Sequence, residues 1–400
     1  MKKKFYMAAL GMLLGAAGAY AQCSNGRYIS YLFPHSISTV TYSTVYSQQM
    51  DIYQPVGDVA TSRPLIILAH GGSFFGGNRV ADLTVDSLCA RFARRGYVTA
   101  SIDYRLSTLP NMVNPDSTYA IDEVMKAISD GKAAIRYFVK DAATTNTYKI
   151  DTNNIFIGGN SAGAVLYMHV GYATDSTEYP DYIDTAMVHN GGFEGNSGNA
   201  GYTTKSKAVI NLAGALNMVS FVNTGDMPSV NVQGDADNTV PYNCAYPLSG
   251  GVRVKLCGLG ALEPEYAAKG ISHMSKVYPG AGHVPWSTDA VMFNSVDSLV
   301  RVFLYSLVCP GVNAVHSLHA ATEVALFPNP ATGLVNIASA VPVSELSVSD
   351  QTGRTVYTVS GINKERLELN TSRYAPGIYF IRLTFADDSN TPVVKRIIVQ

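Results

Sequence analysis

Two kinds of hydrophobic pattern follow one another along the chain. From about residue 37, STVTYSTVYSQQMDIYQP alternates apolar and polar positions and is rich in aromatic and β-branched residues, which predicts a pair of antiparallel strands. The next segments contain short continuous apolar runs: PLIILAHGG, YVTASIDYRL and NIFIGG, and later KAVINLAG, PSVNVQGD and MSKVYPGAGH. Continuous runs are typical of strands that are covered on both faces.

Helical periodicity separates these runs. Apolar residues recur at helical spacing over about residues 81–95 and 120–141, again after Ser161, and finally in DAVMFNSVDSLVRVFLYSL. Strands that alternate with helices pair in parallel, because each helix carries the chain back across the sheet. The pattern therefore predicts an α/β domain with a mostly parallel sheet and helices on both faces.

An irregular insertion interrupts this alternation before KAVINLAG. It covers about residues 174–205 and is rich in glycine, asparagine and tyrosine. Loops of this length are usually functional or mobile. Two interpretations remain open: a lid or substrate-shaping segment, and a surface loop with no role in a site.

The pattern changes again after Cys309. The segments LVNIASA, ELSVSD, TVYTVSG, RLELNTS, GIYFIRLTF and VVKRIIVQ alternate strictly and are separated by turn residues. Six or seven short strands of this kind predict a small all-β sandwich domain. A carbohydrate-binding or adhesion domain would show the same pattern, although the tail has no obvious row of exposed aromatic residues beyond Tyr374 and Tyr379.

The N-terminus, MKKKFYMAALGMLLGAAGAYAQC, has three lysines, an apolar stretch and small residues, which is typical of a secretory signal peptide cleaved before Gln22. That stretch is shorter than the roughly 20 residues of a spanning helix, so we expect no transmembrane segment in the mature protein. We therefore expect a signal peptide over residues 1–21, an α/β domain over 22–312, a linker over 313–322 and a β-sandwich over 323–400.

Composition narrows the class of protein. Hydrophobic residues make up 47% of the chain and charged residues 15%, with a formal net charge of -1, as expected for a globular protein. No basic block follows the first few residues, so nucleic acid is not an expected partner.

Export makes disulfides possible, and the chain has five cysteines, so at least one has no partner within the chain. We expect Cys89 to be the free one, because it lies on the apolar face of a predicted helix. A pair between Cys244 and Cys257 would close a short loop, and one between Cys23 and Cys309 would join the two ends of the large domain. The sequence decides neither pairing.

The stretch NIFIGGNSAGA places Ser161 between a buried strand and a helix, with Gly159 and Gly163 two residues away on either side. In a sharp strand-to-helix turn, side chains at those two positions would collide with the neighbouring strand and helix. Such a turn lifts the serine hydroxyl clear of the sheet and directs it at a helix N-terminus, where negative charge is stabilised. Ser161 is therefore the candidate nucleophile.

A serine hydroxyl needs a base to remove its proton, and the base needs an acid that holds its tautomer. His283, in YPGAGHVPW, lies on a glycine-rich loop before the closing helix and is the candidate base, with His189 of the insertion as a weaker alternative. GDADNTVP offers Asp235 and Asp237 as acids. We choose Asp237, which lies deeper in the loop, and expect Asp235 to hydrogen-bond the turn.

The segment AHGGSFFGGN follows the first buried strand. Residues with small or no side chains let backbone N–H groups approach an oxyanion closely. The expected oxyanion hole consists of the amides of Gly72, Ser73 and Ala162. We expect His70 to hold this loop in place and not to act as a base.

Four motifs in this order, HGGSFFGG, GNSAG, GDADNTVP and GAGH, resemble the esterase, lipase and carboxylesterase branch of the α/β-hydrolase superfamily over about residues 37–308. Ser73 stands where the commoner pattern has a third glycine. The tail, with LFPNPATGLVNI, SVSDQTGRTVY, APGIYFIRL and VVKRIIVQ, resembles the C-terminal sorting domain of the type IX secretion system of Bacteroidota. That resemblance implies export through the periplasm to the outer surface or the medium, with the secretion machinery as a partner.

The sequence thus predicts a secreted serine hydrolase that cleaves carboxylic esters through an acyl-enzyme, with no metal or organic cofactor. Acetyl or feruloyl groups on polysaccharide are the substrates that we consider first. A peptidase of the prolyl-oligopeptidase kind is one alternative, because the fold does not decide between ester and amide bonds. A non-catalytic surface binding protein on a hydrolase scaffold is the other.

Overall fold

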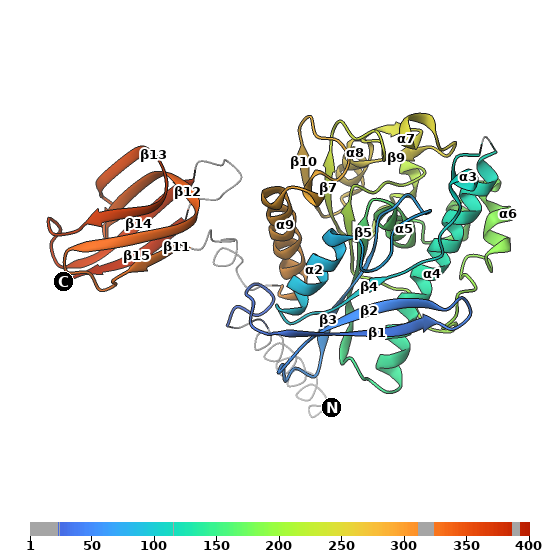
Figure 1. Cartoon of the computed structure of the whole chain (residues 1–400), viewed down its shortest axis with the longest axis horizontal. Coiled ribbons are helices and arrows are strands. Elements are labelled where there is room, and N and C mark those ends of the chain that lie inside the picture. The colour runs from blue at the N-terminus through green and yellow to red at the C-terminus, as the bar shows by residue number, and fades with distance from the viewer. Residues whose placement is uncertain (1–22, 24, 115, 311–323, 386–392) are drawn as a thin grey trace, which may run out of the picture. The chain divides into compact units, whose positions relative to one another are not determined.

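The computed structural model describes residues 23, 25–114, 116–310, 324–385 and 393–400. They fall into two compact units on either side of residue 312, and each unit is described by itself (Figure 1). The predicted signal peptide, residues 1–21, and the predicted linker, residues 313–322, lie outside the described residues.

The first unit contains an eight-stranded sheet in the order β1-β2-β4-β3-β5-β6-β7-β10. The β1-β2 and β2-β4 pairs are antiparallel, and the other pairs are parallel. Every residue of β3, β4, β6 and β7 is buried, which explains their continuous apolar runs. The strands are β1 (His35–Ser43), β2 (Gln48–Pro55), β3 (Arg63–Ala69), β4 (Val98–Ile102), β5 (Ile150–Asn160), β6 (Ala208–Leu212), β7 (Ser229–Gly234) and β10 (His273–Tyr278).

Helices cover both faces of this sheet, which confirms the predicted fold class (Figure 1). On one face, α2 (Leu83–Ala93) and α9 (Ala290–Val308) share a core with the sheet; on the other, α4 (Ser117–Ala143), α5 (Ala162–Tyr172) and α8 (Leu259–Lys269) form a second core. The smaller elements are α3 (Leu109–Met112), η1 (Ser176–Glu178), α6 (Asp181–His189), η2 (Val219–Phe221), β8 (Cys244–Ala245), α7 (Pro247–Gly250), β9 (Leu256–Cys257) and η3 (Pro285–Ser287).

Among the described residues, α9 alone is long and apolar enough to cross a membrane by length and composition. In this structure it packs on the sheet instead, with Val296, Val300 and Leu304 fully buried. Its buried Asp297 accepts two hydrogen bonds from Arg95 at 2.7 and 2.6 Å. Its apolar face is therefore explained by the core of the first unit.

The insertion has two parts that differ in their contacts. Residues 174–189 contain η1 and α6. The turns that follow are bonded to the buried polar side of α4, where Lys132 donates to the carbonyl oxygen of Phe193, and Arg136 to those of Glu194 and Tyr202. The second half of the insertion is therefore fixed to α4.

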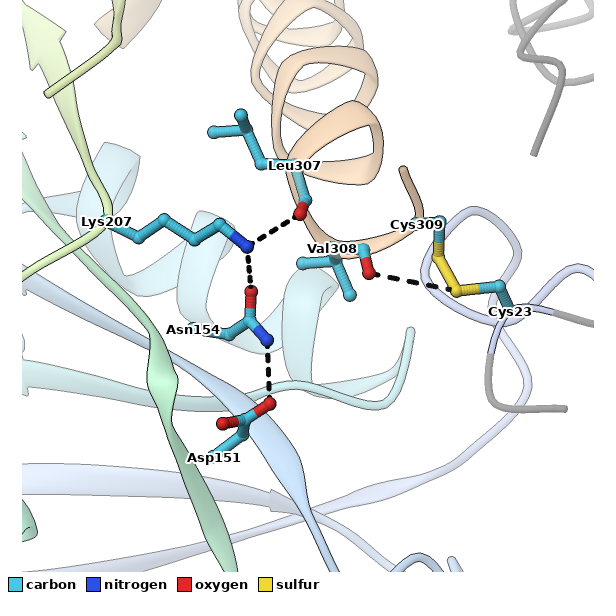
Figure 2. Close-up of a disulfide and its surroundings, with 7 residues drawn as sticks. All are labelled: Cys23, Asp151, Asn154, Lys207, Leu307, Val308 and Cys309. Atoms are coloured by element: carbon cyan, nitrogen blue, oxygen red, sulfur yellow. Dashed lines mark hydrogen bonds between the residues drawn. A yellow bond between two sulfur atoms is a disulfide. The ribbon is translucent and has the colours of Figure 1, made fainter. Parts of the chain in front are cut away.

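Cys23–Cys309 and Cys244–Cys257 are disulfides, and buried Cys89 is free, which confirms the expected cysteine roles. The Cys23–Cys309 bond joins the beginning of the first unit to the end of α9 (Figure 2). Beside it, Lys207 Nζ donates to the Leu307 carbonyl at 2.8 Å and to Asn154 Oδ1 at 2.6 Å, so a cation lies at the helix C-terminus, where the helix dipole favours it (Figure 2).

The second unit is all-β, as predicted, with an antiparallel sheet and its own apolar core. Two of its strands are much longer than expected: β12 spans both LVNIASA and ELSVSD, and β13 spans both TVYTVSG and RLELNTS. Register shifts between Ala338 and Glu345 interrupt the pairing of these strands, so one long strand carries two expected ones. The strands are β11 (Val324–Phe327), β12 (Leu334–Asp350), β13 (Thr355–Asn370), β14 (Gly377–Phe385) and β15 (Val393–Val399).

Candidate active site

Ser161 lies at the sharp turn between β5 and α5. Its backbone has φ 55° and ψ -118°, a strained conformation for a residue with a side chain. A Cβ on Gly159 would lie 2.4 Å from the carbonyl oxygen of Ala69, and one on Gly163 would lie 2.1 Å from the same atom. Both glycines are therefore required by the approach of β3, as the sequence predicts.

Three side chains that are distant in the sequence meet at this turn. His283 Nε2 lies 2.7 Å from Ser161 Oγ, and His283 Nδ1 lies 2.7 Å from Asp237 Oδ2. The Asp237 side chain is fully buried, whereas the His283 side chain is 18% exposed. Because a carboxylate accepts and cannot donate, the Nδ1 atom of His283 carries a proton, which leaves Nε2 to accept the proton of Ser161.

The two aspartates of GDADNTVP have different partners. Asp237 Oδ1 accepts hydrogen bonds from the amides of Thr239 and Val240, at 2.9 and 3.0 Å, so the loop fixes the carboxylate that faces His283. Asp235 Oδ1 instead accepts from the amide of Gly280 at 2.6 Å. Asp235 thus holds the neighbouring loop that leads to His283, rather than its own turn as expected.

The turn after β3 contains two of the three expected oxyanion donors, Gly72 and Ser73. Gly72 has φ 124°, and a Cβ there would lie 2.1 Å from the carbonyl oxygen of Gly76, so only glycine fits. Ser73, at φ 54°, and Ala162, the first residue of α5, line the same cavity as Ser161. Gly72 is not among the lining residues, and its carbonyl accepts from the amides of Phe75 and Gly76, at 3.1 and 3.0 Å.

His70 holds this turn, as expected. Its Nδ1 lies 2.6 Å from the carbonyl oxygen of Gly71, and its ring stacks on Tyr104 at 4.3 Å. Burial lowers the pKa of His70, so the imidazole is neutral at pH 7. The alternative base His189 ends α6, where its side chain is 67% exposed and 3.8 Å from Asp122.

A hydrogen-bond relay, which the sequence reasoning missed, joins the three loops of the site. Asp82 Oδ2 accepts from the amide of Gly71 at 2.8 Å and from Asn160 Nδ2 at 3.0 Å. Asn160 directly precedes Ser161, and its Oδ1 accepts a hydrogen bond from Trp286 Nε1 at 3.3 Å. Trp286 lies three residues after His283 in the chain. Two features of the sequence could have indicated these contacts: Asp82 stands at the start of a predicted helix, and the polar Asn160 ends a buried strand.

An apolar cavity lies beside Ser161. Its wall comes from α3, α4, α5, α6 and residues 239–256, and most of its side chains are apolar. Tyr179 and Ile183 of the insertion belong to this wall. Residues 174–189 therefore shape the cavity, which favours the first interpretation of the insertion.

His169 also belongs to the wall of this cavity. Its Nδ1 donates to the carbonyl oxygen of Val165 at 2.8 Å, and its Nε2 accepts from the amide of Asn217 at 3.1 Å. Burial lowers the pKa of His169 to about 4, so it contributes no charge at pH 7. Within the described part of the chain, no group of three or more His, Cys, Asp or Glu side chains could hold a metal ion.

Residues 50–221 match the BD-FAE family, and residues 325–400 match the family described as the secretion system C-terminal sorting domain. Similar solved structures include esterase 2 of Thermogutta terrifontis phosphonylated by cyclosarin, which is 20% identical with a TM-score of 0.51 over 68% of this chain and 94% of that one.

Two further structures from Thermogutta terrifontis, each described as a novel thermophilic esterase, are similar to this chain. The native form is 18% identical, with a TM-score of 0.51 over 70% of this chain and 95% of that one. The propionate-bound form is 19% identical, with a TM-score of 0.50, and the match covers 68% of this chain and 94% of that one. At these identities, the similarity shows that this chain and the two structures share a fold.

Together these matches place an esterase-like α/β-hydrolase domain before a type IX sorting domain. The sorting domain indicates export to the outer surface or the medium, with the type IX secretion machinery as a partner.

Proposed function

We propose that the protein is a serine hydrolase that cleaves carboxylic esters through an acyl-enzyme intermediate. The observation that carries this proposal is the continuous chain of hydrogen bonds from Asp237 through His283 to Ser161, with 2.7 Å at each step. Its position beside an apolar cavity supports a reaction on a substrate that is partly apolar. The solved esterases support it too, because one of them is phosphonylated and another binds propionate.

Each triad residue has one role. Ser161 Oγ attacks the carbonyl carbon while its proton passes to His283 Nε2, and Asp237 holds the imidazole in the required tautomer. His283 then returns the proton to the leaving alkoxide, and an alcohol departs. A water molecule repeats the sequence on the acyl-enzyme: it loses a proton to His283, releases the carboxylic acid, and Ser161 Oγ regains its proton.

Backbone amides stabilise the tetrahedral oxyanion. Ala162 lies at the N-terminus of α5, where the first amides have no partner within the helix and the helix dipole favours negative charge. We assign the amides of Gly72, Ser73 and Ala162 to the oxyanion hole, with Gly72 also required for the turn that positions Ser73. A donor of this kind is worth about 10²- to 10³-fold in kcat.

The domain boundaries are part of the proposal. We infer that residues 1–21 form an export signal, residues 22–312 the hydrolase, residues 313–322 a linker and residues 323–400 the sorting domain. The disulfide between Cys23 and Cys309 supports the extent of the hydrolase, because it ties the first and last described segments of that unit together.

The peptidase alternative is tested by the choice of bond. Rates of hydrolysis are compared on an acyl nitrophenyl ester and on the nitroanilide of the same acyl group, with purified wild-type protein and Ser161→Ala. We expect turnover of the ester, little of the anilide, and neither with Ser161→Ala. Comparable kcat/KM values on the ester and on the nitroanilide would instead favour a peptidase.

A further inference from the structure

The cavity beside Ser161 lies on one side of the ester bond that would be cleaved. It is lined by Ser161 and by Ser73 and Ala162, but His283 is not among its lining residues. The imidazole must lie next to the leaving oxygen in order to protonate it, so the alcohol part of an ester occupies the side of His283. The acyl part then points the other way, into the cavity.

The wall of the cavity suits a chain without charge. No Asp, Glu, Lys or Arg is found among the described residues that line it. Its single imidazole, His169, has a pKa of about 4 and is neutral at pH 7. A carboxylate or an ammonium group on the acyl part would therefore be buried without a counter-charge.

Most polar atoms of the wall already have partners. Asn217 gives its amide to His169 and its side-chain NH₂ to the carbonyl oxygen of Lys255 at 2.8 Å, while its Oδ1 accepts from Tyr182 at 2.8 Å. The hydroxyl groups of Ser73, Thr239 and Tyr179 are the remaining side-chain polar groups in the wall besides Ser161. A large apolar area is thus paired with few free hydrogen-bonding groups.

Resting on the proposed function above, we propose that this cavity is an acyl-binding pocket that selects aliphatic acyl chains of medium length. An acetyl group ends one methyl beyond its carbonyl carbon, so it would contact little of an apolar wall that extends from Ala162 to α4 and α6. A chain of six to ten carbons would instead cover the apolar residues of α4 and α6, such as Ile121, Met125 and Ile183, which are at most 6% exposed. Each buried methylene is worth about 0.8 kcal/mol, or roughly fourfold in kcat/KM.

Two isomeric esters test the direction and the preference together. Ethyl hexanoate and hexyl acetate have the same atoms, so their overall hydrophobicity is matched, and they differ in which side of the ester carries the chain. We expect kcat/KM for ethyl hexanoate to be at least about tenfold higher, and kcat/KM for nitrophenyl esters to rise from acetate to octanoate by about fourfold per methylene at first.

Two substitutions in α6 test whether the cavity determines the preference between the two isomeric esters. Ile183 lines the pocket and is 5% exposed, whereas Val188, on the same helix, is 73% exposed and does not line it. Ile183→Trp fills the pocket, so the ratio of ethyl hexanoate to hexyl acetate hydrolysis should fall about tenfold or more. Val188→Trp is the matched control and should keep the wild-type ratio. If Ile183→Trp does not fold, the wild-type isomer pair still decides.

The outcomes separate this inference from the proposed function. Three results would overturn the acyl-chain assignment and still leave a serine esterase. They are equal kcat/KM values for hexyl acetate and ethyl hexanoate, a higher kcat/KM for the nitrophenyl acetate than for the octanoate, and a higher kcat/KM for methyl ferulate than for every aliphatic ester. If no ester is turned over and a fluorophosphonate does not label Ser161, the proposed function itself is wrong.

Discussion

Asp82 Oδ2 accepts a hydrogen bond from Asn160 Nδ2 at 3.0 Å, and the same oxygen accepts from the amide of Gly71 at 2.8 Å. One carboxylate therefore connects the residue before Ser161 with the turn that contains two of the proposed oxyanion donors, Gly72 and Ser73. Its other oxygen caps α2 by accepting from the amides of Thr84 and Val85. All four partners are donors, so no neutral side chain of this size can satisfy them all.

Asp82→Ala should lower kcat on a short-chain ester by roughly 10- to 100-fold with a smaller change in KM, because a small displacement of the oxyanion turn weakens transition-state binding more than substrate binding. Asp82→Asn should give an intermediate kcat. The matched control is Asp289→Ala, which removes the same kind of helix cap from α9 and costs about 1 kcal/mol of stability. Equal kcat values for Asp82→Ala and Asp289→Ala would reduce Asp82 to an ordinary cap.

Asp237→Asn should reduce kcat by about 10⁴-fold, because the amide no longer holds the Nδ1 proton of His283 and the imidazole presents the wrong tautomer to Ser161. Asp235→Asn is the control, since Asp235 bonds Gly280 and not His283. We expect less than about a tenfold loss in that variant. Steady-state kinetics of the two purified variants decide, and a larger loss with Asp235→Asn would reverse the assignment.

Stability should depend on pH through His169. Its folded pKa of about 4 lies below the unfolded value of about 6.5, so between these values the unfolded chain binds a proton that the folded chain excludes. The free energy of unfolding should therefore fall as pH falls from 6.5 to 4, by up to ~3 kcal/mol from this residue. Glutamine does not titrate between pH 4 and 6.5. The difference in the free energy of unfolding between the wild type and His169→Gln, measured by urea denaturation, should therefore change over this interval. Parallel pH curves would contradict the prediction.

The two disulfides should differ in their contribution to stability. Cys23–Cys309 spans 286 residues and Cys244–Cys257 spans 13, and a longer closed loop loses more chain entropy in the unfolded state. We expect Cys23→Ser with Cys309→Ser to lower the free energy of unfolding by ~2–5 kcal/mol, more than Cys244→Ser with Cys257→Ser. Denaturation without reductant measures both. The reverse order would show that strain or local packing outweighs loop closure.

Local features of the site could be predicted from the sequence because each depends on a few adjacent residues. Gly159 and Gly163 indicate close approach around Ser161, and the structure places the carbonyl oxygen of Ala69 against both. The order of buried strands and amphipathic helices likewise predicts the parallel sheet, since covered strands must be apolar on both faces. His283 could be chosen among eight histidines because its loop follows a strand and is rich in glycine.

Long-range features could not be predicted in this way. The relay through Asp82, Asn160 and Trp286 joins three segments whose separation in space has no signature in the sequence. The acyl pocket is assembled from α3 to α6 and residues 239–256, so no single window of sequence reveals its size. The long strands β12 and β13 were expected as pairs of short strands because the segments between the expected strands break the strict alternation without ending the strand.

The central claim is that Ser161 is a nucleophile activated by His283, and covalent labelling tests it most directly. A fluorophosphonate is incubated with wild-type protein, Ser161→Ala and His283→Gln, each verified as folded by circular dichroism, and the modified peptide is identified by mass spectrometry. We predict a single adduct on Ser161 in the wild type, none in Ser161→Ala, and labelling slowed by at least about 10³-fold in His283→Gln. Folded wild-type protein that stays unlabelled, or an adduct that persists in Ser161→Ala, would contradict the account.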